Sequence, residues 1–233
     1  HRLSSAIVMS IAIIVLGSML PIAVKDFRAF DRTVTVKGLC EREVEADKVI
    51  WPINYRVASN DLSDLTAKME SNRRTIVQFL KDGGIDESEI TFSAPKISDK
   101  YSQEYVGTDN RRFRYISQNV ITVSTEKVSK VQPLTTRVQE LLKAGVIVSS
   151  ENYWDDNIQY LFEGLNEIKP DMIHEATANA RVAAEQFATD SDSKIGKIKT
   201  ASQGTFSIED RDATTPQIKR VRVVTSLTYY LVK

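Results

Sequence analysis

The sequence predicts an α+β fold: antiparallel sheets with helices packed on one face, in two loosely repeated ββα-type halves, preceded by one N-terminal transmembrane helix. Three observations predict it. The chain opens on an apolar run of membrane length, several later segments alternate apolar and polar side chains with a period of two, and the segments between them repeat apolar side chains at helical spacing.

The opening segment has the composition of a membrane span. From Leu3 to Val24 it contains no charged side chain and consists largely of Ile, Val, Leu, Met and Ala. About 20 apolar residues in a helix cross a hydrocarbon core about 30 Å thick. We therefore predict that residues 1–26 form a transmembrane anchor or uncleaved signal. The alternative is a cleaved secretory signal, but Leu20 and Pro21 interrupt the small-x-small pattern of a cleavage site.

The flanking charges do not fix the orientation of this span, because Arg2 lies on one side and Lys25 and Arg28 on the other. No later segment resembles a second span. We therefore expect the N-terminus inside and the bulk of the chain in the periplasmic or extracytoplasmic space. Residues 31–233 then form the α+β domain, with a candidate subdivision near 125–145.

Charge and cysteine content exclude several classes of function. The chain has 31 basic and 31 acidic residues, a formal net charge of zero, whereas nucleic-acid binding relies on a concentrated excess of Lys and Arg. We therefore expect no nucleic-acid partner. Cys40 is the only cysteine, which excludes an intrachain disulfide and a Cys-based zinc site. We expect an inert, partly buried thiol there, with an intermolecular disulfide as the alternative.

The first half of the domain begins with two strands, because residues 33–38 and 49–57 alternate apolar and polar side chains. We expect these two strands to pair as a hairpin. Pro52 cannot donate to a ladder, so it predicts a sheet edge or a bulge in the second strand. Residues 90–97 and 113–124 predict a second strand pair, joined by a polar arm.

A helix between the two strand pairs is predicted to start at Asp61 or Ser63 as its cap and to stop at Gly83 and Gly84. Its apolar side chains recur at helical spacing. They are Leu62, Leu65, Met69, Ile76 and Leu80.

The second half repeats the pattern loosely. A helix is predicted to end at Gly145, with Pro133 in its first turn, followed by strands at 146–149 and 158–162. The longest helix is predicted over 171–189, with Asp171 in its first turn. Two strands, 195–201 and 218–232, close the domain. The apolar stripe of the first of these helices is Val128, Val131, Val138, Leu141 and Leu142, and that of the longest is Ile173, Ala176, Ala180, Ala183 and Phe187.

Four blocks of the chain, in this order, carry a family resemblance: TVTVKGLCEREVEADKVIWPINYRV, FLKDGGIDESEITFSAPKISDKY, QNVITVSTEKVSKVQPLTTRVQELLKAG and HEATANARVAAEQFATDSDSKIGKIKTA. They resemble the SIMPL-domain family of bacterial envelope proteins. The resemblance implies a periplasmic or membrane-attached protein of poorly defined role, associated with oxidative and envelope stress and prone to form large ring-like homo-oligomers. The family offers no agreed catalytic residues. This chain departs from it in having Ala46, where relatives commonly have Pro, before Asp47.

The residues themselves show no constellation that carries chemistry. His174 is the only histidine beyond His1, so a site with several histidines is excluded within one chain, and we expect a surface or capping role for it. Asp155 and Asp156 lack the spacing of a calcium loop. Gly83 and Gly84 lack the Lys-Ser/Thr pair of a phosphate-binding loop. We therefore predict no catalytic, cofactor-binding or metal-binding residue and no cofactor.

Two basic clusters allow more than one interpretation. They are Arg111, Arg112 and Arg114 with Phe113 and Tyr115, and Lys219, Arg220 and Arg222. We expect these charges to pair with acidic residues across a solvated sheet face. The alternatives are that they stack on bases or bind lipid phosphates, or that they and the arm at 101–112 dock onto a neighbouring subunit.

The sequence therefore favours a non-enzymatic, membrane-anchored envelope protein that self-associates into a large ring- or cage-like homo-oligomer, in oxidative or envelope stress protection. The alternative is an extracytoplasmic binding module for a peptide, lipid or envelope polymer, held in the groove between sheet and helices. A hydrolase or redox enzyme is the third hypothesis, with His174 and Cys40 as its best candidates. No small-molecule ligand is identified by the sequence.

Overall fold

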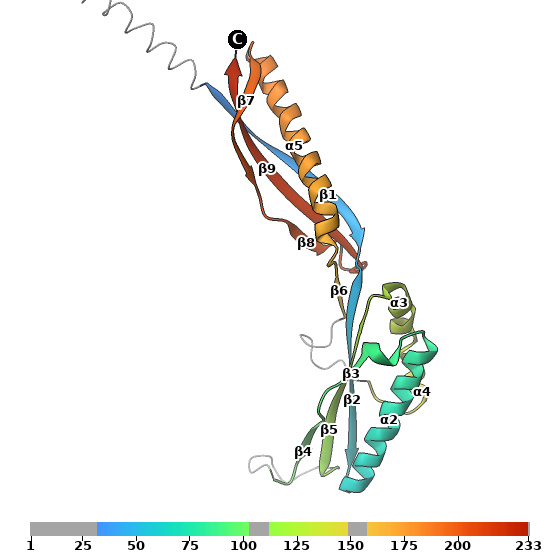
Figure 1. The fold of residues 1–233 in the computed structure, drawn as a ribbon. Coiled ribbons are helices and arrows are strands. Elements are labelled where there is room, and N and C mark those ends of the chain that lie inside the picture. Colours follow the sequence, from blue (N-terminus) through green and yellow to red (C-terminus); the bar gives the residue numbers. More distant parts are fainter. Residues whose placement is uncertain (1–31, 103–111, 149–157, 233) are drawn as a thin grey trace, which may run out of the picture. The chain divides into compact units, whose positions relative to one another are not determined.

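The computed structural model of the chain describes residues 32–102, 112–148 and 158–232 (Figure 1). The expected anchor at 3–24 lies outside the described residues, as do Asp155, Asp156 and most of the arm at 101–112. Within those three ranges, no helix combines the length and the hydropathy that a membrane crossing requires.

The chain divides into two compact units, each built from segments far apart in the sequence. The first unit comprises the described residues up to Arg42, Asn166–Glu209, and the described residues from Arg220 onward. The second unit comprises Glu43–Leu165 and Asp210–Lys219, and residues 125–145 lie wholly within it. Both units combine helices with antiparallel strands, which confirms the α+β class. The loose repetition of two ββα halves stays a prediction.

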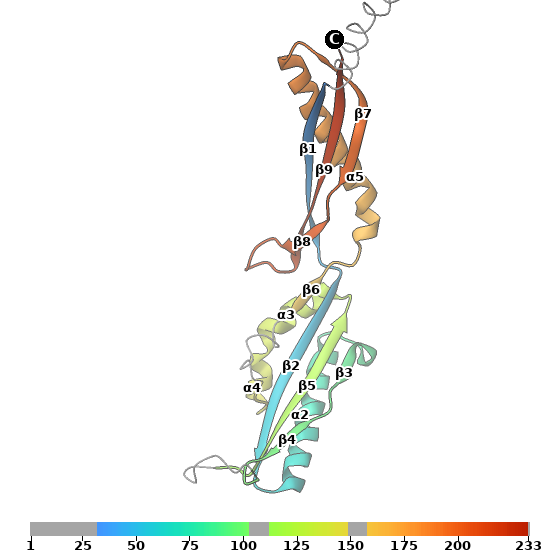
Figure 2. The same ribbon diagram turned by 90° about the vertical axis from the view of Figure 1, so that its left-hand side faces the viewer.

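The first unit is a sheet covered on one face by a single long helix, α5 (Figures 1 and 2). Its strands run in the order β1-β9-β7, and β8 also pairs with β9. The elements are β1 (Thr33–Glu45), α5 (Leu165–Asp190), β7 (Lys194–Gln203), β8 (Ser207–Asp210) and β9 (Ile218–Val232).

The expected hairpin between the first two strands is wrong, because β1 pairs with β9 near the C-terminus. The backbone N–H of Leu231 donates to Arg32 O at 2.8 Å, and the hydroxyls of Thr35 and Thr228 lie 3.0 Å apart. A period of two predicts a strand but does not say which strand it pairs with. The two residues that follow β1 are Ala46 and Asp47, not the Gly-containing pair that tight hairpins favour.

Helix α5 packs on the sheet through alanines at every fourth residue. The buried residues are Met172, Ala176, Ala180, Ala184 and Ala188. The expected contribution of Phe187 to this face is wrong, since Phe187 is 59 % exposed. The helix also begins at Leu165, so Asp171 does not lie in its first turn as expected, and Pro170 lies inside the helix.

The backbone of α5 lies directly on Gly38 of β1. A Cβ atom at Gly38 would lie 1.8 Å from Ala176 O and 2.4 Å from Ala180 N, both backbone atoms. No side chain larger than hydrogen fits in this space without moving the helix. The run of alanines on α5 and the glycine on β1 therefore set the distance between helix and sheet.

The second unit is a five-stranded sheet packed against α2, α3 and α4 (Figure 2). Its strand order is β3-β5-β2-β6, and β4 also pairs with β5, which confirms the second expected strand pair. The elements are β2 (Lys48–Ser59), α2 (Leu62–Asp82), a 3-10 turn (Glu87–Glu89), β3 (Ile90–Phe92), β4 (Lys96–Asp99), β5 (Tyr115–Thr125), α3 (Val128–Arg137), α4 (Gln139–Lys143) and β6 (Gln159–Leu161).

Pro52 lies in an inner strand, β2, but among the described residues it has a ladder partner on one side only. That partner is Thr122 of β5. On the other side of β2, the ladder with β6 covers only Lys48 to Ile50, and the next contact is a bridge from Tyr55 to Val148. The edge predicted from Pro52 is therefore present locally, although β2 as a whole is not an edge strand.

The caps predicted for α2 are confirmed. The side chain of Asp61 accepts a hydrogen bond from Asp64 N at 2.8 Å, and Gly83 ends the helix. Gly84 follows with φ +89°, a conformation that favours glycine. The buried face is Leu65, Ile76, Phe79 and Leu80, so the expected burial of Leu62 is wrong: it is 49 % exposed.

The helix predicted from Val128 onward is interrupted. It forms α3 and then α4, with Val138 between them. Pro133 lies inside α3 and not in its first turn, so that prediction is wrong. The apolar stripe was nevertheless placed correctly at Val131 and Leu141, which are both buried.

The contact between Gly38 and α5 makes a direct stability prediction. Gly38→Ala places a methyl group against the helix backbone and should lower the unfolding free energy by about 3 kcal/mol. The melting temperature should fall by about 6–12 °C for a chain of this size. The neighbouring variant Lys37→Ala, whose side chain is exposed, serves as the control and should leave thermal unfolding nearly unchanged. Equal melting temperatures for both variants would contradict the packing.

Candidate functional site

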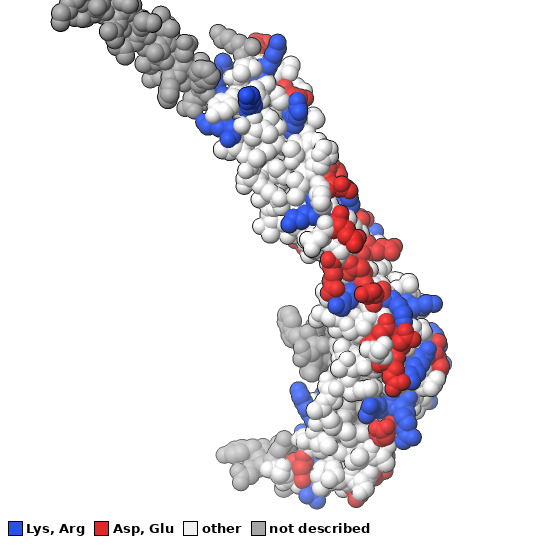
Figure 3. All heavy atoms as spheres, in the orientation of Figure 1, with Lys and Arg blue, Asp and Glu red and all other residues white. Residues whose placement is uncertain are grey.

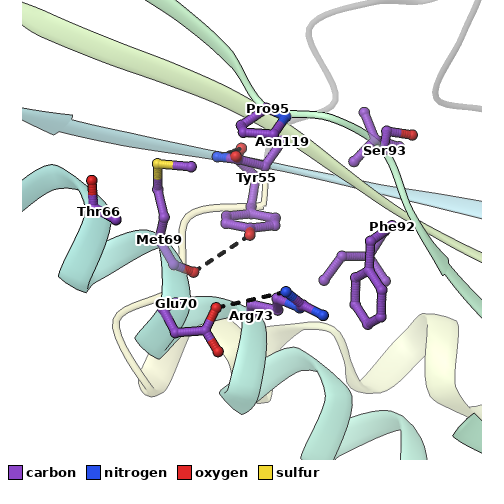
Figure 4. Close-up of a pocket in the computed structure, with 11 residues that line it drawn as sticks. Tyr55, Thr66, Met69, Glu70, Arg73, Phe92, Ser93, Pro95 and Asn119 are labelled. Atoms are coloured by element: carbon purple, nitrogen blue, oxygen red, sulfur yellow. Dashed lines mark hydrogen bonds and ion pairs between the residues drawn. The ribbon is translucent and has the colours of Figure 1, made fainter.

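A cavity of about 220 Å³ lies in the second unit between α2 and the sheet (Figure 4). Helix α2 contributes Thr66, Met69, Glu70 and Arg73, and the facing strands contribute Tyr55 and Asn119. Apolar walls with a few converging polar groups are typical of ligand sites in proteins. The cavity is therefore the strongest candidate site within the described residues.

The floor of the cavity is the point where the buried face of the sheet changes from apolar to polar. Ile53 pairs with Ile121, and the next buried pair is Tyr55 with Asn119. Asn119 is only 6 % exposed, and its amide Nδ2 donates to Ser117 Oγ at 3.0 Å and to Tyr55 O at 3.5 Å. A carboxamide has two N–H donors, so both of them have partners here. The group can offer a ligand its carbonyl oxygen.

Tyr55 supplies the second polar group. Its hydroxyl donates to the backbone oxygen of Met69 at 3.5 Å, a long hydrogen bond that links β2 to α2. Burial raises the pKa of this phenol, with the nearby charges of Arg73 and Glu70 opposing each other. Tyr55 is therefore neutral at physiological pH, and its oxygen can accept a hydrogen bond.

At the mouth of the cavity, Arg73 lies over the ring of Phe92, 3.9 Å from its centroid (Figure 4). Its Nη1 is 3.7 Å from Glu70 Oε2, so the one cation at the mouth is balanced by a carboxylate. Stacking of a guanidinium on an aromatic face is favourable in its own right. The mouth therefore carries no net charge from this pair.

The edge of the sheet is distorted beside the cavity. Phe92 pairs with Ile121 and Lys96 pairs with Gln118, so three residues of the edge lie opposite two residues of β5. This is a β-bulge at residues 93–95, and it contains Pro95, which lines the cavity. Bulges are over-represented beside functional sites because they redirect side chains and end regular pairing.

Cys40 does not take part in this site. It lies on β1 in the first unit and is 1 % exposed, so it is more deeply buried than expected. Burial raises the pKa of its thiol, and a hydrogen bond with Glu175 raises it further. A neutral, enclosed thiol is a poor nucleophile, which agrees with the inert role expected for it.

His174 lies on the exposed surface of α5, in the same unit as Cys40. Its position therefore supports the surface role expected for it. Among the residues described, no group of three or more His, Cys, Asp or Glu side chains is arranged to hold a metal ion.

Within the first basic cluster, Arg114 is paired with an acidic residue as expected. Arg114 Nη2 lies 3.0 Å from Asp99 Oδ2, and the guanidinium also lies 4.9 Å from the ring centroid of Tyr115. Arg112 lies 5.8 Å from the ring centroid of Phe113, and Arg111 is outside the described residues. Figure 3 shows acidic and basic side chains interspersed over α2 of the second unit.

Lys219 and Arg222 of the second basic cluster are paired as well. Lys219 forms an ion pair with Asp210 across the β8–β9 hairpin, and Arg222 Nε lies 3.3 Å from Glu41 Oε1 on β1. These contacts support pairing with acidic residues for Lys219 and Arg222, as for Arg114 in the first cluster.

The sequence suggested a groove between sheet and helices as one alternative, but it predicted none of the residues that line this cavity. The only local signal is that Ser117 and Asn119 are polar residues at positions of β5 whose period-two neighbours, Ile121 and Val123, are apolar and buried. The contact of Arg73 with Phe92 joins α2 to β3, and no pattern in the sequence predicts it.

The comparison with protein families decides the classification. The family model SIMPL, described as a protein of unknown function (DUF541), matches residues 34–229. The chain belongs to the SIMPL family. The match confirms the resemblance expected from the four sequence blocks, and it extends over both units, so the two units together make up the SIMPL domain. No curated protein matches this SIMPL chain.

The ion pair of Arg114 predicts a pH dependence. The hydrogen bond from Arg114, with a further one from the backbone N–H of Tyr101, lowers the pKa of Asp99. A lowered folded-state pKa contributes stability above the unfolded pKa of about 3.9, and this contribution is lost as the pH falls below it. Asp99→Asn should therefore melt at a lower temperature than the wild type at pH 7, and the difference should shrink at pH 3. A difference that stays constant between these pH values contradicts the assignment.

Proposed function

We propose that this SIMPL protein is a non-enzymatic, membrane-anchored envelope protein that self-associates into a large ring- or cage-like homo-oligomer and acts in oxidative or envelope stress protection. The apolar run at 3–24 supports the anchor, with the bulk of the chain periplasmic or extracytoplasmic. The open edge of the sheet in the first unit supports the self-association, and it carries the proposal.

Strand β1 forms this edge over its whole length. It has β9 on one side, and within the described residues no strand pairs with its other side. Its first eight residues, TVTVKGLC, contain one charge, Lys37. A long, regular edge strand with few charges is a template for pairing with another strand.

The opposite edge of the same sheet carries the features that prevent pairing. β7 has register shifts between Ile195 and Ile198 and between Ile198 and Thr200. It also carries Lys194, Lys197 and Lys199. Bulges and lysines are common means by which proteins block edge-to-edge association. The contrast between the two edges supports β1, and not β7, as the edge proposed to pair with another chain.

The register of β1 with β9 identifies the groups that are free to pair. Leu231 N donates to Arg32 O, and Ala46 N donates to Gln217 O at the far end of the strand. The contacts of Thr35 with Thr228 and of Glu41 with Arg222 share this register. In an antiparallel ladder, residues that exchange hydrogen bonds alternate along the strand. The even-numbered residues of β1 therefore bond to β9, and the odd-numbered ones direct their backbone groups outward.

A second copy of the chain fits this edge. Two β1 strands placed antiparallel around a two-fold axis would exchange the outward hydrogen bonds of residues 33–39 and join two sheets into one. Such an interface is isologous and alone produces only a dimer. A ring therefore needs a second kind of contact between subunits. We propose the sheet face opposite α5 for that contact, because no helix among the described residues covers it (Figure 2).

The second candidate function is the binding module for a peptide, lipid or envelope polymer. The cavity between α2 and the sheet of the second unit favours it. The two functions are compatible, because the cavity and the edge of β1 lie in different units.

The edge pairing predicts the effect of one proline. Lys37→Pro removes an outward N–H but leaves the bonds to β9 intact, since residue 37 is odd-numbered. Light scattering of the full-length protein in detergent should show loss of the oligomer. Lys37→Ala removes the same charge but keeps the N–H, so this control should remain oligomeric. An oligomer that survives Lys37→Pro, or a wild type that is monomeric at micromolar concentration, contradicts the proposal.

The anchor predicts the behaviour of the chain in fractionation. The full-length protein should stay with the membrane fraction after alkaline carbonate extraction, because residues 3–24 are long enough to span the bilayer. A variant lacking residues 1–26 should be recovered in the soluble fraction. Recovery of the intact chain in the cytosolic fraction contradicts the anchor.

A further inference from the structure

The two polar groups at the floor of the cavity beneath α2, Asn119 and Tyr55, have their own donors engaged. Ser93 and Arg73, by contrast, carry donors at its edge (Figure 4). Both N–H groups of Asn119 are taken by Ser117 and by the backbone of Tyr55. The hydroxyl hydrogen of Tyr55 is directed at Met69 O. What these two groups present to the cavity is oxygen lone pairs.

The walls around these acceptors are apolar. They are formed by the thioether of Met69, the ring of Phe92, Pro95 and Ile121 (Figure 4). A ligand that fits must therefore place an apolar body against the walls and an N–H or O–H donor toward the oxygens. Buried acceptors that receive no donor are costly, so the donor is what selects the ligand.

The charges at the mouth decide between ionic and neutral ligands. Arg73 is engaged by the ring of Phe92 and by Glu70, and Glu70 also has Arg74 Nε at 3.8 Å. The cations are thus already committed to a carboxylate and a ring. An anionic ligand would meet the carboxylate of Glu70 at the mouth and the acceptor oxygens of Asn119 and Tyr55 at the floor, so the site favours a neutral ligand over an anion.

We infer that this cavity binds a neutral amide carried on a short branched apolar group, with the amide N–H donating to Asn119 and Tyr55. A volume of about 220 Å³ holds an apolar group of this size, and the rest of a larger ligand would extend from the mouth. The same chemistry is offered by a free small amide and by a leucine residue of a peptide with its backbone N–H. The site is independent of self-association, because it lies in the second unit.

A methionine that lines the cavity can report ligand binding by NMR. Of its four methionines, Met69 lines the cavity and Met172 is buried in the first unit. The full-length protein in lipid nanodiscs, labelled with ¹³C at the methionine methyl groups, is titrated with isovaleramide and observed by NMR. The Met69 signal should shift and saturate with a dissociation constant on the order of 1–10 mM, and the Met172 signal should not move.

The matched control ligand is isovalerate, which has the same apolar body but a carboxylate without an N–H donor. It should produce no saturable shift of Met69. The capped tripeptide N-acetyl-Ala-Leu-Ala-amide distinguishes the two sources of the chemistry. Tighter binding than that of isovaleramide assigns the site to a peptide, and weaker binding assigns it to a free small amide.

Two variants test the contacts separately. Asn119→Ala should weaken isovaleramide binding at least about fivefold, because it removes one hydrogen-bond acceptor. Phe92→Ala removes an apolar wall that is partly exposed, so it should fold even if Asn119→Ala does not, and it should also weaken binding. Thr122→Ala, at a β5 position that alternates with the buried Ile121 and Val123, is the matched control and should leave the affinity unchanged.

The inference is overturned if isovalerate shifts Met69 as isovaleramide does, or if no saturable shift occurs up to about 100 mM, well beyond the expected dissociation constant. Unchanged affinity in Phe92→Ala would also overturn it. None of these results bears on oligomerisation, which is measured separately with the β1 variants.

Discussion

The first unit depends on one steric constraint, the contact of the α5 backbone with Gly38. Since Ala176 O and Ala180 N occupy the space of a Cβ atom there, helix and sheet approach as closely as a polypeptide allows. The buried alanines at every fourth residue of α5 extend this approach along the strand. In this unit, close contact between backbones and small side chains contributes more to the packing than large apolar side chains do. The second unit instead has a core of Leu, Ile, Val and aromatic residues.

This constraint has a consequence for the edge of the sheet. With α5 packed on its inner face, β1 keeps one register with β9 from Arg32 to Ala46. Edge strands usually escape pairing by twisting, bulging or carrying charge, as β7 does with its register shifts and lysines. β1 has little of this protection in its first eight residues, and that is why we place the self-association of this SIMPL protein there.

Local patterns in the sequence predicted most elements and the pairing of β3 and β4 with β5, but not the partner of β1. The alternation at 218–232 gave β9 with its observed bounds, and the cap at Asp61 gave the start of α2. Pairing of β1 with β9 was missed because it joins the two ends of the domain and leaves no local trace. The face of α5 was misplaced at Phe187, since the face is fixed by Gly38, far away on another strand. A groove between sheet and helices was suggested, but the residues that line the cavity were not, since they depend on the pairing of Tyr55 with Asn119 and on the bulge beside Phe92.

We propose that the outward backbone groups of β1 pair with a second copy of the chain. Amide hydrogen exchange, resolved by residue along β1 in the full-length protein in nanodiscs, tests it most directly. If this pairing is correct, the amides of Thr35, Lys37 and Leu39 exchange as slowly as those of the even-numbered residues bonded to β9. Rapid exchange at these three positions, beside slow exchange at Val36 and Cys40, would contradict it.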